Sequence, residues 1–155
     1  MTSTQTALRL HDAIREASEL FQTVDEGRTT AIPAGGGWSA RQILGHLIDS
    51  ACNNHRRFVM GQWPSLERYD SYEQDEWVAC QRYDTVPWSD LLTLWAAYNR
   101  HLAHVMACVS ESSAAREAWA PDGARRITLA FLMDDYVRHL RHHLDQLRTR
   151  LAPAA

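Results

Sequence analysis

Residues 128–151 read TLAFLMDDYVRHLRHHLDQLRTRL, and this stretch predicts one long amphipathic helix. Its apolar residues recur every three or four positions, which is the spacing that places side chains on one face of an α-helix. A helix with one apolar face gains its stability by packing that face against other helices. The apolar residues are Leu129, Met133, Tyr136, Leu140, Leu144, Leu147 and Leu151.

Three other segments show the same helical periodicity. One covers residues 6–24, and another begins after Pro87 and ends near residues 108–112. The remaining segment starts at Ser39, where Gln42 three residues later completes a capping-box pattern, and should end near Met60. The sequence therefore predicts an all-α fold, a four-helix bundle that forms a single domain over residues 1–155.

A connection of about 26 residues, 61–86, separates the second predicted helix from the third and is longer than most loops in compact domains. Its aromatic density indicates an ordered segment. Two interpretations stay open: the segment covers a ligand site, or it covers one end of the bundle core. Its aromatic residues are Trp63, Tyr69, Tyr72, Trp77 and Tyr83.

Charge and composition exclude several classes of function. A net charge of -3 provides no broad basic surface, so we expect no nucleic-acid partner, and the pairs Arg56-Arg57 and Arg125-Arg126 are typical of a solvated face. No apolar run of membrane-spanning length occurs, and Arg9, His11, Asp12, Arg15 and Glu16 lie where a signal peptide would need an apolar run. We therefore expect a cytoplasmic protein without a membrane partner.

The three cysteines, Cys52, Cys80 and Cys108, are too few and too widely spaced for a disulfide framework or a zinc ribbon. None lies in a motif that would activate a thiol nucleophile. Cys108 fits the periodicity of the third helix as a core or near-core residue.

Helical geometry distinguishes the three histidines of the last helix. At about 100° per residue the apolar face centres between Tyr136 and Leu140, so His143 lies about 50° from that centre, His139 about 90° and His142 about 150°. His142 should therefore point outward. His139 and His143, one turn apart, could bind one cation through two ring nitrogens, although histidines at the edge of a core show the same spacing.

The second helix offers a third ligand. His46, Ser50, Asn53 and Arg57 form a polar stripe about 120° from the centre of the apolar face of that helix. This position is compatible with a site at the edge of the core and equally with a solvated edge.

The other histidines are poorer candidates. His11 has charged neighbours, His104 lies on the polar side of its helix, and His55 has no inward polar partner. His101 lies about 80° from the apolar centre of the third helix and could be a fourth ligand, a substrate contact or a residue at the edge of the core.

Several segments in the same order resemble the DinB-like metalloprotein superfamily, including its thiol S-transferases such as bacillithiol transferases. The resemblance extends from Trp38 to Leu147. It rests on residues 37–50 (GWSARQILGHLIDS), Asn53, residues 57–58 (RF), residues 72–77 (YEQDEW), Leu91-Leu92 with Trp95, residues 99–100 (NR) and residues 128–143.

The resemblance implies a four-helix bundle that is usually dimeric and binds one divalent metal ion through a histidine of the second helix and an H-x-x-x-H pair of the fourth. His46, His139 and His143 occupy these three positions. Similar proteins include thiol S-transferases and a mycothiol-dependent maleylpyruvate isomerase. We therefore expect a homodimer with a zinc or nickel ion, with iron, cobalt and manganese as alternatives.

Our leading hypothesis for the function is a metal-dependent transferase that activates a low-molecular-weight thiol for attack on a small electrophile. Asn53 and Arg57 would orient the thiol, and the aromatic connection with Trp77 would cover the electrophile. Asp49 could fix the tautomer of a ligating imidazole, or it could contact only solvent.

Two other functions stay open. A metal-dependent hydrolase would need a general base, for which Asp49 and Glu73 are candidates, and would work without a thiol. A non-catalytic bundle would use the metal structurally and close its coordination shell with His101 or a carboxylate.

Overall fold

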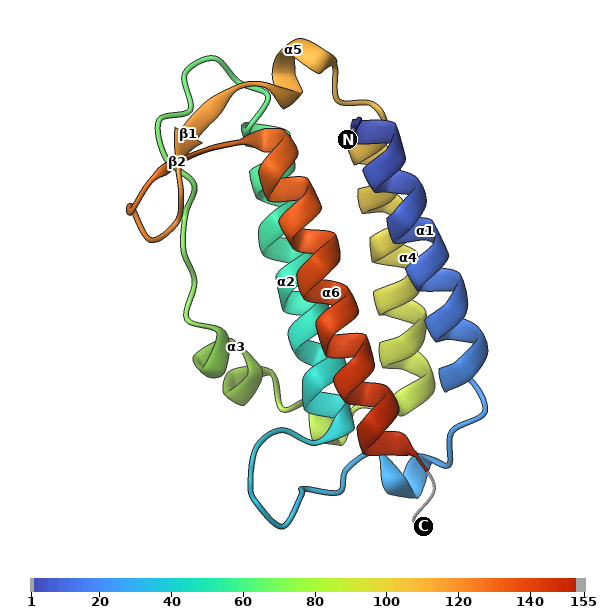
Figure 1. Ribbon diagram of the computed structural model, residues 1–155. Helices are drawn as coiled ribbons and strands as arrows, with labels where there is room; N and C mark the ends of the chain where they lie inside the picture. Colours follow the sequence, from blue (N-terminus) through green and yellow to red (C-terminus); the bar gives the residue numbers. More distant parts are fainter. Residues whose placement is uncertain (1, 153–155) are drawn as a thin grey trace.

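The computed structural model describes residues 2–152 and contains a bundle of four long helices (Figure 1). This architecture confirms the predicted four-helix bundle. The long helices are α1 (Ser3–Phe21), α2 (Ala40–Met60), α4 (Trp88–Ala107) and α6 (Leu129–Leu151). The shorter elements are η1 (Glu26–Arg28), α3 (Gln74–Gln81), η2 (Tyr83–Thr85), α5 (Glu111–Ala114) and the antiparallel strands β1 (Glu117–Trp119) and β2 (Arg126–Thr128).

Side-chain caps determine where the long helices begin. The Ser39 side chain accepts a hydrogen bond from the backbone N–H of Gln42, whose side chain accepts one from Ser39 in return, so the predicted capping box is present at α2. A second capping box joins Thr2 to Gln5, and it explains why α1 begins earlier than the apolar periodicity predicts. At α6 the side chain of Thr128 accepts from the N–H of Phe131.

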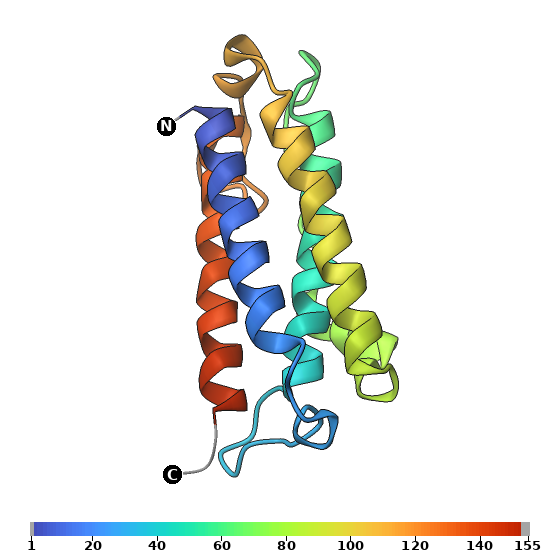
Figure 2. The same cartoon turned by 90° about the vertical axis from the view of Figure 1, so that its right-hand side faces the viewer.

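The helix directions give the bundle its topology. In both views α1 and α6 run one way and α2 and α4 run the other (Figures 1 and 2). α1 packs against α4 and α6, and α2 packs against the same two helices. Because α2 and α4 are parallel neighbours, the chain must return along the bundle between them, and this return explains the long connection.

The connection is attached to the bundle at several points. The N–H of Tyr69 donates to the carbonyl of Trp119, and the N–H of Trp119 donates to the carbonyl of Glu67, so this part of the connection lies against β1. Tyr69 and Tyr83 are buried. The connection therefore covers the side of α2 rather than one end of the core.

Tyr83 packs directly on α2 at Gly45. A Cβ atom added at Gly45 would lie 2.0 Å from the Tyr83 ring, so only glycine permits this approach. The contact holds the segment with α3 and η2 against the N-terminal half of α2.

Two features differ from the expectations about the core and the surface. Cys108 is exposed, and the prediction of a core position was wrong, because Cys108 is the C-cap of α4 and the helical periodicity does not extend past it. The small β1–β2 hairpin was not predicted, since strands of three residues leave little periodic pattern. Within residues 2–152, no helix is both long and apolar enough to cross a membrane.

Candidate metal centre

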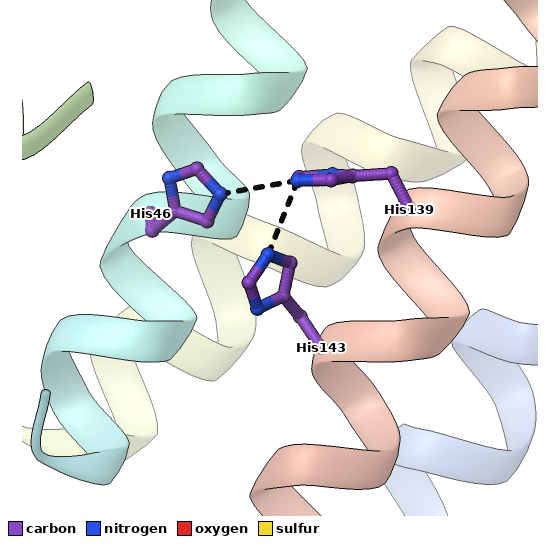
Figure 3. A group of neighbouring side chains, drawn as sticks. All are labelled: His46, His139 and His143. Carbon is purple, nitrogen blue, oxygen red and sulfur yellow. Dashed lines mark hydrogen bonds between the residues drawn. The ribbon is translucent and has the colours of Figure 1, made fainter. Parts of the chain in front are cut away.

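Three histidine side chains from two helices point toward one another between α2 and α6 (Figure 3). The Nε2 atom of His139 lies 3.3 Å from Nε2 of His46 and 3.1 Å from Nε2 of His143. Within the part of the chain that the structure describes, these three residues are the one group of three or more histidine, cysteine or acidic side chains whose ligand atoms all lie within 4.8 Å of each other.

The spacing of these nitrogens fits one metal ion. Two imidazole nitrogens that each lie about 2.0–2.1 Å from a tetrahedral ion are separated by roughly 3.3 Å. The distances of 3.3 and 3.1 Å around His139 are close to this separation. The donor set is therefore suited to a divalent ion that accepts three imidazole ligands.

Burial keeps the three imidazoles neutral, which is the protonation state that a metal requires. His46 is 0% exposed, and burial, with smaller contributions from His143 and His139, lowers its pKa to about 3. Burial likewise lowers the pKa of His139 to about 4 and lowers the pKa of His143. At neutral pH all three rings can present a lone pair.

Neighbouring side chains orient two of the rings. Nδ1 of His143 lies 2.8 Å from Oε1 of Gln146, so the ring can donate there and leave Nε2 free as a ligand atom. The Trp38 ring packs beside His46 with its centroid 5.0 Å from the imidazole centroid. The buried Nδ1 of His46 has no hydrogen-bond partner.

Asp49 lies one turn after His46 and is buried rather than solvated. Its Oδ1 accepts hydrogen bonds from the hydroxyl of Tyr83, at 2.6 Å, and from the amide of Gln81. Its Oδ2 is buried and has no partner. Burial raises the pKa of Asp49, while the two donors oppose that rise. The alternative that Asp49 contacts only solvent was wrong.

A cavity of about 320 Å³ extends from His139. Its walls come from α2, from the segment that leads into α3 and the first residue of that helix, from the β1–β2 hairpin and from α6. The cavity gives a small molecule access to the histidine group. Its lining residues are Ser50, Asn54, Arg57, Tyr72, Gln74, Ala120, Pro121, Asp122, Arg125, Ile127, Phe131, Leu132, Asp135, Tyr136 and His139.

The fold and the histidine group agree with a comparison of the sequence against protein families. The model of the DinB superfamily matches residues 9–147, which is most of the chain. The chain belongs to the DinB superfamily.

Among curated proteins, this DinB-superfamily chain is similar to the putative metal-dependent hydrolase YfiT of Bacillus subtilis (strain 168). The two are 27% identical over 109 residues, which cover 70% of this chain and 61% of YfiT. The match thus spans less than two thirds of the length of that relative.

Two solved structures share the fold. The structure of Bacillus subtilis YfiT, described as a probable metal-dependent hydrolase with an unusual four-helix bundle topology, matches with a TM-score of 0.82 at 21% identity over 96% of this chain and 86% of YfiT. A histidine-to-alanine variant of the mycothiol-dependent maleylpyruvate isomerase matches with a TM-score of 0.77 at 13% identity, over 100% of this chain and 62% of that one.

The three residues predicted to bind substrate lie in different places in the DinB fold. Arg57 lines the cavity of about 320 Å³ that extends from His139. Asn53 donates from Nδ2 to the carbonyl of Asp49 at 2.9 Å and lines a separate pocket of about 20 Å³. Trp77 lies on α3, 37% exposed, with its ring centroid 5.6 Å from that of Tyr72.

The remaining histidines lie outside the group. His101 is exposed, and its ring centroid is 5.0 Å from that of His55, so it does not serve as a fourth ligand in this arrangement. His55 does have a polar partner, contrary to expectation, because its Nδ1 lies 3.2 Å from the Tyr98 hydroxyl on α4. His142 is exposed, as the angular analysis predicts.

Several cavity residues were missed in the sequence. Asn54 lines the cavity while its neighbour Asn53 does not, and the spacing of four residues from Ser50 could have indicated this. Arg125 was assigned to a solvated face, but the hairpin brings it to the cavity wall. No local pattern could have shown that, since it depends on how the hairpin docks.

Proposed function

We propose that this protein binds one divalent metal ion through Nε2 of His46, His139 and His143 and promotes attack of a low-molecular-weight thiol on a small electrophile. The observation that carries the proposal is the convergence of three neutral imidazoles, one of which, that of His139, lines a cavity of about 320 Å³. An ion with three imidazole ligands and an open position lowers the pKa of a thiol or water that reaches it.

The chain's own residues would hold and orient the reactants. Arg57 faces the cavity and can donate two parallel hydrogen bonds to an acidic group. The apolar side chains of Phe131 and Leu132 limit the water that reaches the reacting atoms. Asn53 and Trp77 would contact only the part of a ligand that extends beyond this cavity.

Imidazole ligands suit zinc and nickel, which are our first choices, and iron, cobalt and manganese are the alternatives. Availability of the ions then selects among them. We also propose a homodimer as the functional unit, as the family resemblance implies. The names of two similar proteins support metal-dependent chemistry and a thiol partner: a putative metal-dependent hydrolase and a mycothiol-dependent isomerase.

The test is metal content, measured by plasma mass spectrometry on untagged protein. We expect near-stoichiometric metal in the native chain and loss of that metal in a His139→Ala, His143→Ala variant. His142→Ala is the matched control, because His142 lies on the same helix but is exposed. Equal metal in the native and double-variant proteins would contradict the three-histidine site. The loaded protein is then tested with small electrophiles, with and without thiol.

A second candidate is a metal-dependent hydrolase, which the name of the Bacillus subtilis relative favours. The carboxylate of Asp135 lines the cavity and could serve as a general base. Glu73, considered for this role from the sequence, is exposed at the start of α3 and does not line the cavity. Turnover that needs no thiol would favour the hydrolase.

A further inference from the structure

The cavity beside His139 carries two guanidinium groups on its walls. Arg57 comes from α2, and Arg125 comes from the turn of the β1–β2 hairpin. They are separated by 68 positions in the sequence, and the docking of the hairpin brings both to one cavity.

Arg57 is half-buried and makes its contacts with neutral groups. Its Nε, at 3.0 Å, and its Nη2 both donate to the backbone carbonyl of Asp70, and its Nη1 donates to Oδ1 of Asn54 at 3.4 Å. The Tyr72 ring centroid lies 5.9 Å from the guanidinium carbon. The carboxylate of Asp70 forms an ion pair with Arg56 instead. Among residues 2–152, no carboxylate forms an ion pair with Arg57.

Burial is the main reason why the pKa of Arg57 lies below its ordinary value, with Tyr72 and Asp70 opposing that shift. A buried cation without a carboxylate partner is costly, and such groups usually find an anion. The hydrogen-bond partners of Arg57 are neutral, so an anion can pair with it from the cavity that it lines.

Arg125 is also without an acidic partner in the described part of the chain. Arg125 is exposed, and its guanidinium carbon lies 4.9 Å from the centroid of the Phe131 ring, so the side chain packs on the cavity wall.

Of the two acids of the same cavity, Asp135 forms an ion pair with Arg138, whereas Asp122 accepts a hydrogen bond from the backbone N–H of Ala124 and keeps its charge. Two arginines and one unpaired carboxylate leave the wall with a net positive charge.

We propose that Arg57 and Arg125 together form a carboxylate-binding subsite, so that the substrates of this protein include a small molecule with a carboxylate group. This inference rests on the proposed function, because the subsite gains its purpose from the neighbouring histidine group. The planar guanidinium matches a carboxylate through two parallel hydrogen bonds.

The position of Arg57 sets the length of the ligand. Arg57 follows His46 by 11 residues on α2, which corresponds to a rise of roughly 16 Å along the helix. An arginine side chain spans part of this distance. The carboxylate must therefore be several bonds away from the atom that reacts beside the histidine group, and the carboxylate can belong to the thiol or to the electrophile.

Two probe pairs separate these sources. N-acetylcysteine and N-acetylcysteamine are thiols that differ by the carboxylate, and phenylpropionate and phenylpropionamide differ by charge without a thiol. Binding is measured by calorimetry on metal-depleted protein and again on metal-loaded protein. We expect the carboxylate member of one pair to bind at least about tenfold more tightly than its neutral partner. This preference should be present in the metal-depleted protein as well as in the metal-loaded protein.

Variants assign the effect to the two arginines. Arg57→Gln and Arg125→Gln should each reduce that preference by about tenfold, and Arg15→Gln, an exposed arginine on α1 away from the cavity, should leave it unchanged. Arg57→Lys keeps the charge and should retain part of the preference, which covers the case in which Arg57→Gln disturbs the fold.

Several outcomes would overturn the subsite. One is equal binding of both members of each pair. Another is a carboxylate preference that requires metal and survives both glutamine variants, because the carboxylate would then bind the metal and the proposed function would stand without the subsite. A stronger preference for phosphate-bearing probes would overturn the carboxylate class. If the native protein binds no metal but the glutamine variants still lose the carboxylate preference, the result would contradict the proposed function alone.

Discussion

Asp49 and His46 each bury one polar atom that has no partner, and the two residues are one turn apart on α2. The unpaired atoms are Oδ2 of Asp49 and Nδ1 of His46. These two atoms do not hydrogen-bond each other. Tyr83 and Gln81 hold the other oxygen of Asp49, so the carboxylate has little freedom to turn away.

We predict that Asp49→Asn lowers the affinity for metal by about 10- to 100-fold, because the change removes a buried carboxylate, one turn from His46, that would offset the charge of a bound cation. A competition titration against a chromophoric chelator measures the affinity. Asp145→Asn, an exposed change on α6, serves as the control. An unchanged affinity in a folded Asp49→Asn variant would show that this carboxylate does not act on the bound cation.

At the scale of single residues, helical angles predicted how the histidines of α6 point but not how deeply α2 is buried. His46 was placed at the edge of the core, yet it is 0% exposed. Neighbours that the sequence does not place beside it, Trp38 and the α6 histidines, close over that edge. The same limit applies to Arg125, whose position depends on the docked hairpin.

At the scale of elements, the contact between Gly45 and Tyr83 couples the connection to α2. We predict that Gly45→Ala destabilises the protein by about 1–3 kcal/mol, because the added methyl group overlaps the Tyr83 ring and has no free space. Urea denaturation measures the change. Gly35→Ala is the control, because a Cβ there meets nothing within 4 Å. Equal stability of the two variants would mean that Tyr83 moves aside without cost.

The long helices were predictable because each carries its own periodicity and most carry their own cap. The direction of α4 relative to α2 was not, since a long connection is compatible with either direction. The strands β1 and β2 were missed because each is three residues long and is stabilised by pairing with its partner and with the connection.

At the scale of the molecule, the buried histidines make the metal-free fold sensitive to acid. In the unfolded chain these rings titrate near 6.5, but in the folded chain the pKa of His46 is about 3 and that of His139 about 4. At pH values between the folded and the unfolded pKa of each ring, the unfolded state binds more protons than the folded state, so the stability of the fold decreases as the pH falls. We predict that the melting temperature of chelator-treated protein decreases from pH 7 to pH 5.

A loss of about 1 kcal/mol corresponds to roughly 2–4 °C in a domain of this size, which differential scanning calorimetry resolves. His46→Gln removes the most deeply buried of the three rings and should flatten this dependence. His104→Gln, an exposed histidine on α4, should not. A metal-free native sequence whose melting temperature is constant from pH 7 to pH 5 would show that the rings take up protons as readily in the folded state as in the unfolded state.

The pairing of the helices also has a consequence for the order in which the chain can fold during synthesis. The partners of α1 are α4 and α6, and α6 extends to Leu151. The apolar face of α1 therefore stays uncovered for the seconds that translation of α4 and α6 takes at about 5–20 residues per second. Nascent α1 is a segment that a chaperone could hold, and its side of the core closes only after α6 has been made.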